Sequence, residues 1–170
     1  DTQQPGMFVF YDAPAEASST GKPLDIGDFN GDGCGDIAAG GSFASFGGLD
    51  GWRREAGHVR IIMDLCEIAG HIAMEEEGEH SNTIISVYGA HAGDMVGIEV
   101  FVDDFNADGY DDVLFGAQNY DGEAQDRSNA GAAYLVLGRP DFINGNIDLL
   151  NPPDTVIVFY GATAEDRFGL

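Results

Sequence analysis

The sequence predicts an all-β protein built from repeated four-stranded antiparallel sheets. Three observations support this fold class. The chain repeats itself at a spacing of about 75 residues, its apolar residues fall in short runs bounded by Gly, Asp and Asn, and helical periodicity is weak throughout. In addition, 25 glycines against six prolines in 170 residues indicate many tight turns.

Four blocks of sequence recur in the same order, which indicates a duplicated unit. The matching segments are 27–41 with 103–117, 56–64 with 130–138 and 70–74 with 145–149, and a threefold match joins 8–13, 85–90 and 157–162. We therefore expect one repeat at 1–82, a second repeat at 83–155, and the first strand of an incomplete third repeat at 156–170.

Each full unit is expected to form four short strands. The best helical candidate, 67–80, aligns with a β-like segment of the second unit, so it is interpreted as a strand or a loop with an acidic bulge. Repeated four-stranded units predict propeller blades, but a closed propeller needs about four to eight of them, so two units and a fraction do not close. In the second unit the expected strands are 84–88, 97–102, 112–115 and 132–137.

An acidic motif, Asp-x-Asn-x-Asp-Gly-x-x-Asp, occurs once in each full unit. Alternate oxygen side chains of a tight loop converge on one point, and a hard cation such as Ca²⁺ collects about six to eight oxygens. The candidate ligands are the side chains at positions 1, 3, 5 and 9 and the backbone carbonyl at position 7. They are Asp28, Asn30, Asp32, Cys34 and Asp36 in the first loop, and Asp104, Asn106, Asp108, Tyr110 and Asp112 in the second.

Three other interpretations of this motif fit its residues less well. An EF-hand needs a glutamate at position 12, where this chain has Ala39 or Phe115, and helices on both sides. A plain polar turn would also be rich in Asp, Asn and Gly, but two copies at matching places favour a cation site. Magnesium suits such a protein cage less well than calcium, because it demands a small octahedral shell.

The strand–loop–strand pattern followed by Gly-Gly or Gly-Ala, together with Phe168–Gly169, resembles the FG-GAP repeats of integrin-α-type calcium-binding β-propellers, here of the bacterial or archaeal extracellular kind. The resemblance covers nearly the whole chain and implies blades with a Ca²⁺ ion in the loop between two strands. The chain departs from the family pattern where Thr20–Gly21 and Val96–Gly97 align with the Phe-Gly pair.

The resemblance implies a non-catalytic, Ca²⁺-stabilised extracellular or cell-surface module for structure or adhesion, with two Ca²⁺ sites. The expected partners are other copies of the chain, joined through incomplete blades, or the rest of a longer chain, and a protein or glycan ligand. The alternative is that the chain is the propeller portion of a larger secreted enzyme or ligand-binding protein. The sequence itself shows no Gly-x-Ser-x-Gly nucleophile motif.

A weaker partner-binding site is suggested by aromatic residues beside arginines. Trp52, Arg53 and Arg54 lie in one loop, and Tyr120 lies in the matching loop of the second unit. Aromatic and arginine side chains are enriched in binding hot spots. The same composition also fits a tryptophan that packs under its own loop beside arginines that offset nearby acids.

The charge balance excludes two classes of partner. With 30 Asp and Glu against seven Lys and Arg, the formal net charge is -23 at pH 7, which opposes binding to nucleic acid and to anionic membrane surfaces. No apolar run of about 18 residues predicts a membrane-spanning helix. Cys34 and Cys66 are too few for a disulfide framework, and either one bridge or two free thiols is compatible with the sequence.

Overall fold

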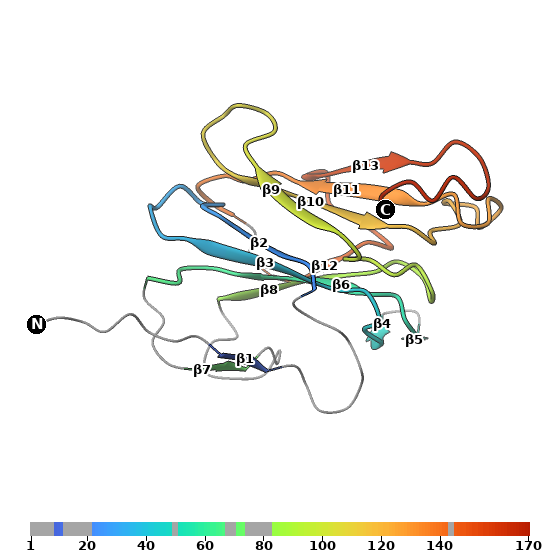
Figure 1. Cartoon of the computed structure of the whole chain (residues 1–170), viewed down its shortest axis with the longest axis horizontal. Coiled ribbons are helices and arrows are strands. Elements are labelled where there is room, and N and C mark those ends of the chain that lie inside the picture. Colours follow the sequence, from blue (N-terminus) through green and yellow to red (C-terminus); the bar gives the residue numbers. More distant parts are fainter. Residues whose placement is uncertain (1–8, 12–21, 49–50, 67–70, 74–82, 143–144) are drawn as a thin grey trace, which may run out of the picture.

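The computed structural model describes residues 9–11, 22–48, 51–66, 71–73, 83–142 and 145–170. Within these ranges the chain forms strands and turns without a helix, which confirms the expected all-β class, and it has no helix long and apolar enough to span a membrane. The strands (Figure 1) are β1 (Val9–Tyr11), β2 (Leu24–Gly27), β3 (Asp36–Gly41), β4 (Phe46–Gly48), β5 (Gly51–Arg53), β6 (His58–Ile62), β7 (His71–Ala73), β8 (Ile84–Tyr88), β9 (Val100–Asp103), β10 (Asp112–Ala117), β11 (Ala132–Val136), β12 (Ile147–Asp148) and β13 (Val156–Tyr160).

Two larger sheets carry most of these strands. The first sheet has the order β12-β8-β6-β3-β2, and the second sheet has the order β13-β11-β10-β9. Apart from β12, which is parallel to β8, all pairs in both sheets are antiparallel. β4 and β5 form a hairpin, and β1 pairs with β7 in parallel. Four antiparallel strands in each sheet agree with the expected propeller-type blades.

The boundaries of the two sheets do not coincide with the boundaries of the sequence repeats. The strand expected to open the second unit, β8, pairs with β6 and so belongs to the first sheet. In the same way β13, expected to begin a third unit, pairs with β11 and completes the second sheet. Each blade therefore takes its last strand from the sequence block that follows it.

The crossover between the sheets explains why β9 begins at Val100 and not at Gly97, as the sequence suggested. Gly97 has a positive φ of 82°, and its neighbour Val96 forms a bridge to Gly57 of the first half. The segment before Val100 thus runs past Gly40 of β3 and past Gly57, which precedes β6. Of the helical candidate at 67–80, residues 71–73 form β7, and the remainder lies outside the described residues.

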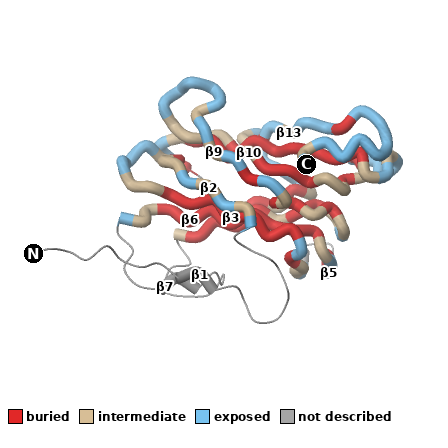
Figure 2. Tube along the Cα trace, viewed as in Figure 1, coloured by how far each residue is buried: buried red, intermediate tan, exposed pale blue. Residues whose placement is uncertain are grey.

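The two sheets stack face to face, and the principal hydrophobic core lies between them. Figure 1 shows the second sheet above the first, with β1 and β7 on the opposite side of the first sheet. Figure 2 shows buried residues concentrated in the middle of this stack. Side chains from both sheets form one buried cluster that includes Ala38, Val59, Ile61, Val113 and Phe115.

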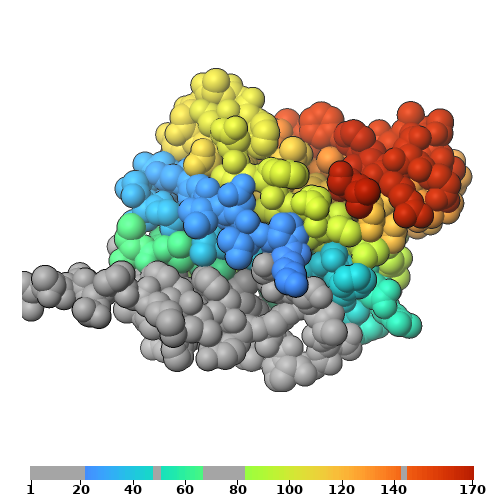
Figure 3. All heavy atoms as spheres, viewed as in Figure 1, coloured from blue at the N-terminus to red at the C-terminus, as the bar shows by residue number. Residues whose placement is uncertain are grey.

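The edges of the two sheets are also joined. The β2 and β9 regions lie against each other in the space-filling view (Figure 3), and the Asp25 carboxylate accepts a hydrogen bond from the Val102 N–H at 2.9 Å. Gly27 faces β9 so closely that a Cβ there would collide with Val102 and Asp111. The stacking therefore brings the loop after β2 next to the loop after β9.

Candidate metal-binding loops

The first acidic loop connects β2 to β3 and is folded around the side chain of Asp28. One carboxylate oxygen of Asp28 accepts hydrogen bonds from the backbone N–H groups of Gly31 and Asp32, at 2.7 and 3.1 Å, and the other accepts from Gly33 at 2.9 Å. Gly31 and Gly33, at positions 4 and 6 of the motif, have positive φ angles of 74° and 84°, which glycine adopts without strain. The aspartate at position 1 thus fixes the turn.

The middle of the first loop is held by Asn30 and Asp32. The Asn30 carbonyl oxygen accepts from the Asp32 backbone N–H at 3.0 Å, and its amide donates to an Asp32 carboxylate oxygen at 3.0 Å. The other Asp32 oxygen accepts from the Cys34 N–H at 2.7 Å. The Cys34 N–H, followed by the Asn30 amide, lowers the pKa of Asp32, so this carboxyl group is ionised at neutral pH.

Asp36, at position 9, ends the first loop and begins β3. Its side chain is fully buried, and its two oxygens accept hydrogen bonds from the backbone N–H groups of Phe29 and Asp64, both at 2.9 Å. Burial, with smaller contributions from the charges of Asp32 and Asp28, raises the pKa of Asp36 to about 6. A buried carboxyl group that feels two neighbouring carboxylates is a site where a cation would favour the ionised form.

The second loop, between β9 and β10, repeats this arrangement. Its equivalent hydrogen bonds run from Asp108 N to Asp104 (3.0 Å), from Gly109 N to Asp104 (2.9 Å), from Asp108 N to Asn106 (2.9 Å), from Asn106 Nδ2 to Asp108 (2.9 Å) and from Tyr110 N to Asp108 (3.0 Å). Fully buried Asp112 accepts from Phe105 N at 3.1 Å and from Gly138 N at 2.8 Å. Burial raises the pKa of Asp112, and the charges of Asp108 and Asp104 contribute.

The ten predicted ligands are therefore brought together in two loops, five in each. Within the described residues, however, no group of three or more His, Cys, Asp or Glu side chains is arranged to hold a metal ion, because the carboxylates are turned toward backbone N–H groups. A carboxylate has about four lone-pair sites, so one that accepts one to three hydrogen bonds retains capacity for a cation. In donor chemistry, an all-oxygen set with several carboxylates fits Ca²⁺.

Cys34, the predicted carbonyl ligand at position 7, has a second role. Its side chain forms a disulfide with Cys66, with a Cα–Cα distance of 5.5 Å, and the described residues contain no free cysteine. Of the two alternatives that the sequence left open, the structure shows the bridge. The bridge ties the first loop to the segment after β6, close to Asp64, while Tyr110 occupies the same position in the second loop.

The four residues considered for partner binding do not form one surface. Arg53 is 3% exposed and forms a bidentate ion pair with Asp148, at 2.6 and 3.0 Å, while also donating to the Gly89 carbonyl at 2.8 Å. Tyr120 is buried and stacks on Tyr160. These contacts make Arg53 and Tyr120 structural residues of the core.

Trp52 and Arg54 remain exposed. The Trp52 side chain is 63% exposed on the β4–β5 hairpin, and the Arg54 side chain is 78% exposed and contacts Glu55 at 3.1 Å. Partner binding therefore remains a prediction for these two residues.

Sequence reasoning missed two residues that position the loops. The Asp111 carboxylate accepts a hydrogen bond from the Asp28 backbone N–H at 2.8 Å, and the Asp111 N–H donates to the Asp28 carbonyl at 3.1 Å, so the two loops are joined directly. Asp64 supplies the N–H that Asp36 accepts. The doubled aspartate at 111–112 is the only signal in the sequence for Asp111, since the motif itself uses only Asp112.

Comparison with protein families agrees with this geometry. Residues 96–136, which span β9, the second acidic loop, β10 and β11, match the family model described as FG-GAP repeat. No curated protein matches the chain. The structure shows the same loop and sheet a second time at the equivalent positions of the first half. The chain therefore carries an FG-GAP repeat at residues 96–136.

Proposed function

We propose that the chain is a non-catalytic, Ca²⁺-stabilised module of propeller-type blades, with one Ca²⁺ ion in each acidic loop. The observation that carries this proposal is the duplication of one loop geometry with a buried aspartate at its base. Asp36 and Asp112 are both fully buried below two further carboxylates, and the pKa of each is raised. Placing three carboxyl groups so close together is costly without a cation, and both loops do so.

In this proposal Asp28, Asn30, Asp32 and Asp36 hold one ion with the Cys34 carbonyl, and the equivalent residues hold the other. The bound ion supplies positive charge that neutralises the loop carboxylates. The protein fixes each loop by hydrogen bonds from its own backbone, so that little order has to be gained on binding. This preformed geometry supports a structural role for the bound ion.

The proposed location is outside the cell or on its surface. The Cys34–Cys66 disulfide supports this location, because disulfides persist in oxidising compartments. Calcium is present there at concentrations that fill sites with a Kd of about 10⁻⁴–10⁻³ M. In that setting the module acts as a structural or adhesive element whose exposed surfaces, among them Trp52, contact a protein or glycan.

Thermal unfolding with and without Ca²⁺ tests the proposal. An ion that binds only the folded chain stabilises it by about 1–3 kcal/mol per site at tenfold to hundredfold excess over Kd, so chelation is expected to lower Tm clearly. Asp104→Asn, which keeps the shape of the side chain, is expected to reduce the effect of chelation by about half.

The matched control is Asp154→Ala, which removes an exposed acid outside the loops and is expected to behave as the unaltered chain does. An equal concentration of Mg²⁺ is expected to restore little of the lost stability. A melting curve that does not respond to chelator in any of these proteins would refute the calcium assignment.

A further inference from the structure

The hairpin of β4 and β5 is present in the first half of the chain and has no counterpart in the second. In the second half, residues 118–130 join β10 to β11 through turns without a strand, and their aromatic residue, Tyr120, is buried. In the first half, the segment that joins β3 to β6 forms the two strands of the hairpin and exposes Trp52. Figure 1 shows the hairpin at the opposite end of β3 from the first acidic loop. The hairpin is therefore an addition to the sheet.

One face of the hairpin is fixed to the body of the protein by two side chains. Phe46 and Arg53 are cross-strand partners, so their side chains lie on the same face. The Phe46 ring packs on Tyr88, with the ring centroids 4.6 Å apart. The Arg53 guanidinium lies 6.0 Å from the centroid of the Phe46 ring and is paired with Asp148. These contacts hold the hairpin in place.

The base of the hairpin is also held by hydrogen bonds. The Glu55 N–H donates to Ser45 Oγ at 2.9 Å. The carbonyls of Arg54 and Glu55 accept hydrogen bonds from backbone N–H groups of the segment after β8, at 2.9 and 3.3 Å. A side chain on a backbone that is already ordered loses less entropy when it binds a ligand.

The opposite face of the hairpin presents Trp52 to solvent. Trp52 is the only tryptophan of the chain and is 63% exposed. Its cross-strand partner is Gly47, and a Cβ added to Gly47 would have no atom within 4 Å. Because glycine has no side chain, the facing strand leaves the indole uncovered. A fixed and uncovered indole ring is a platform on which the flat surface of a ligand can stack.

Polar side chains follow this platform in the chain. Arg54 and Glu55 are 78 and 45% exposed, and their side chains form an ion pair at 3.1 Å. A guanidinium has five N–H donors and a carboxylate has about four acceptor sites, so one ion pair leaves most of them available to a ligand. The exposed part of the hairpin thus combines an aromatic surface with donors and acceptors of hydrogen bonds.

A pyranose ring fits this combination. Its C–H bonds are weakly positive and gather on one face of the ring, so they pack on the negative face of an indole, while the hydroxyl groups at its edge bind polar side chains. A protein partner needs about 800 Å² of surface with an apolar centre. In the described part of the hairpin, residues 46–48 and 51–53, Trp52 is the one large apolar side chain that is exposed. The hairpin therefore suits a sugar better than a protein.

The charge of the chain favours an uncharged sugar. The formal net charge of -23 repels polyanions. Arg54 is paired with Glu55, so these two side chains together contribute no net positive charge that would attract an acidic polymer.

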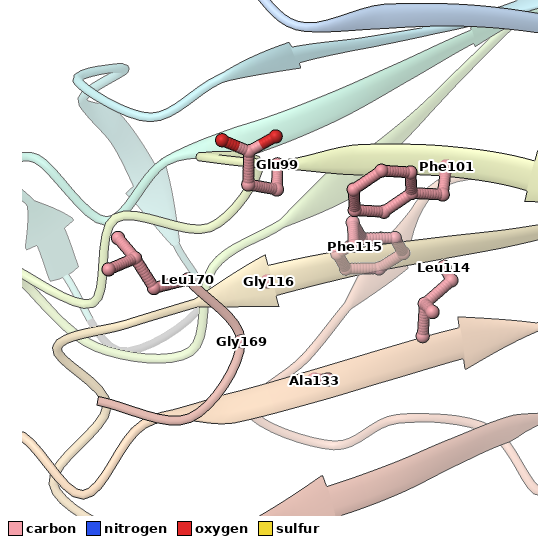
Figure 4. Close-up of a pocket in the computed structure, with 8 residues that line it drawn as sticks. All are labelled: Glu99, Phe101, Leu114, Phe115, Gly116, Ala133, Gly169 and Leu170. Carbon is pink, nitrogen blue, oxygen red and sulfur yellow. The ribbon is translucent and has the colours of Figure 1, made fainter. Parts of the chain in front are cut away.

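The small pocket on the second sheet is a poorer candidate for a sugar. Figure 4 shows the Phe101 ring and the Glu99 carboxylate in this pocket, but none of the eight lining residues has a side chain that donates a hydrogen bond. Sugar hydroxyls would find an apolar surface and an acceptor there, without a donor. The hairpin offers all three through Trp52, Glu55 and Arg54.

We propose that the β4–β5 hairpin binds a neutral polysaccharide, with one pyranose ring stacked on Trp52 and its hydroxyl groups hydrogen-bonded to Arg54 and Glu55. This proposal rests on the adhesive role in the proposed function and names the class of ligand. It does not depend on the calcium sites, because the hairpin follows β3 whereas the first acidic loop precedes it.

The fluorescence of Trp52 reports on this site alone, because the chain has no other tryptophan. The chain is titrated with a soluble β-glucan, a dextran and a galactomannan, and with polygalacturonate as the anionic comparison. At least one neutral polymer is expected to shift the emission to shorter wavelength and to slow acrylamide quenching about twofold, since stacking removes water from the indole. Polygalacturonate is expected to change neither quantity.

Electrophoresis in gels that contain the bound polymer measures variants without the fluorophore. Trp52→Ala is expected to weaken binding at least about tenfold, and Trp52→Tyr to restore part of it. Arg54→Gln is expected to weaken binding about threefold, through the loss of a hydrogen bond. The matched control is Phe101→Ala, which removes a similarly exposed aromatic ring from the second sheet and is expected to bind as the unaltered chain does.

Three outcomes would overturn the proposal. One is that none of the neutral polymers alters the emission of a chain that circular dichroism shows to be folded, or that Trp52→Ala binds as well as the unaltered chain. The second is tighter binding of polygalacturonate. The third is an emission shift that rises with the concentration of the chain alone, since the partner would then be a protein. Emission and Tm are read in the same samples with Ca²⁺ and with chelator, so failure of sugar binding is distinguishable from failure of the calcium sites.

Discussion

The two acidic loops have the same internal hydrogen bonds but different neighbours. In the first loop, Phe29 is enclosed by Phe142, Asp28 is bonded to Asp111, and Cys34 is bridged to Cys66. In the second loop, Phe105 is half exposed, and the Asp104 N–H donates to the adjacent Asp103 side chain. The loop conformation is therefore set locally by its own Asp, Asn and Gly residues, whereas its burial is set by the sheet that follows it.

The segment that follows β8 and the equivalent segment that follows β13 show the same contrast. Asp94 and Asp166 occupy equivalent positions, and each accepts a backbone hydrogen bond from the residue three places earlier, at 2.8 and 2.7 Å. Asp94 is enclosed and 2% exposed, and its burial raises the pKa to about 7. Asp166 is exposed, and its hydrogen bonds from Thr163 lower the pKa. One sequence position thus has opposite electrostatics in the covered and uncovered halves.

The largest difference in stability between the two loops is expected from substitution of Phe29 and Phe105. Phe29→Ala removes a fully buried ring and is expected to lower the free energy of unfolding by about 3–5 kcal/mol, whereas Phe105→Ala is expected to cost less than about 1 kcal/mol. Urea denaturation of both variants measures the difference. Equal losses would show that the second loop is as well packed as the first.

The disulfide is expected to have the next largest effect. Replacing both Cys34 and Cys66 with serine frees a cross-link of 32 residues and is expected to cost about 2–4 kcal/mol. Hydrogen exchange should show faster exchange of the Gly33 amide, while the equivalent Gly109 amide is unchanged. Faster exchange at both glycines would contradict the view that the conformation of each loop is set by its own residues.

The pH dependence of stability is expected to distinguish Asp94, after β8, from Asp166, after β13. The folded-state pKa of Asp94, about 7, lies above its ordinary value of 3.8, so the native state holds a proton that the unfolded state releases. This contribution is fully present below about pH 4 and is lost as the pH rises to 7, which amounts to about 2–3 kcal/mol between pH 5 and 7.

Asp94→Asn is expected to remove this loss, whereas Asp166→Asn is expected to change little in the same range, because its pKa is lowered and not raised. The measurement is the difference in unfolding free energy between each variant and the unaltered chain, across pH 5 to 8. Taking the difference removes the opposite slope from His58, whose burial lowers its pKa to about 3. A flat difference for Asp94→Asn would contradict the assignment.

The local features of the fold were predictable, because they depend on residues close in sequence. The strands at 84–88, 112–115 and 132–137 were identified to within about two residues, as expected for strand ends. The two loops were located by motif spacing, since Asp28 to Asp36 form one turn that is closed by its own backbone. Chemistry that is contained in nine consecutive residues needs no knowledge of the tertiary structure.

Features that depend on distant partners were not predictable. The burial of Arg53 follows from Asp148, 95 residues away, and the link between the loops joins Asp28 to Asp111, 83 residues away. The sequence also did not show to which sheet β8 belongs, because β8 has the same sequence pattern whether it begins one blade or completes another. In each case the pairing is decided by the stacking of two sheets, which leaves no mark on local periodicity.

Calorimetric titration with Ca²⁺ tests the central claim, that the duplicated loops are two cation sites, most directly. The account predicts a stoichiometry of two Ca²⁺ ions per chain, which falls to one in Asp28→Asn and to one in Asp104→Asn and stays at two in Asp154→Ala. Because the first loop is held by the disulfide and by Asp111, the ion lost in Asp28→Asn is expected to be the tighter one. No binding heat in a folded chain, or a stoichiometry unchanged by both loop variants, would contradict the account.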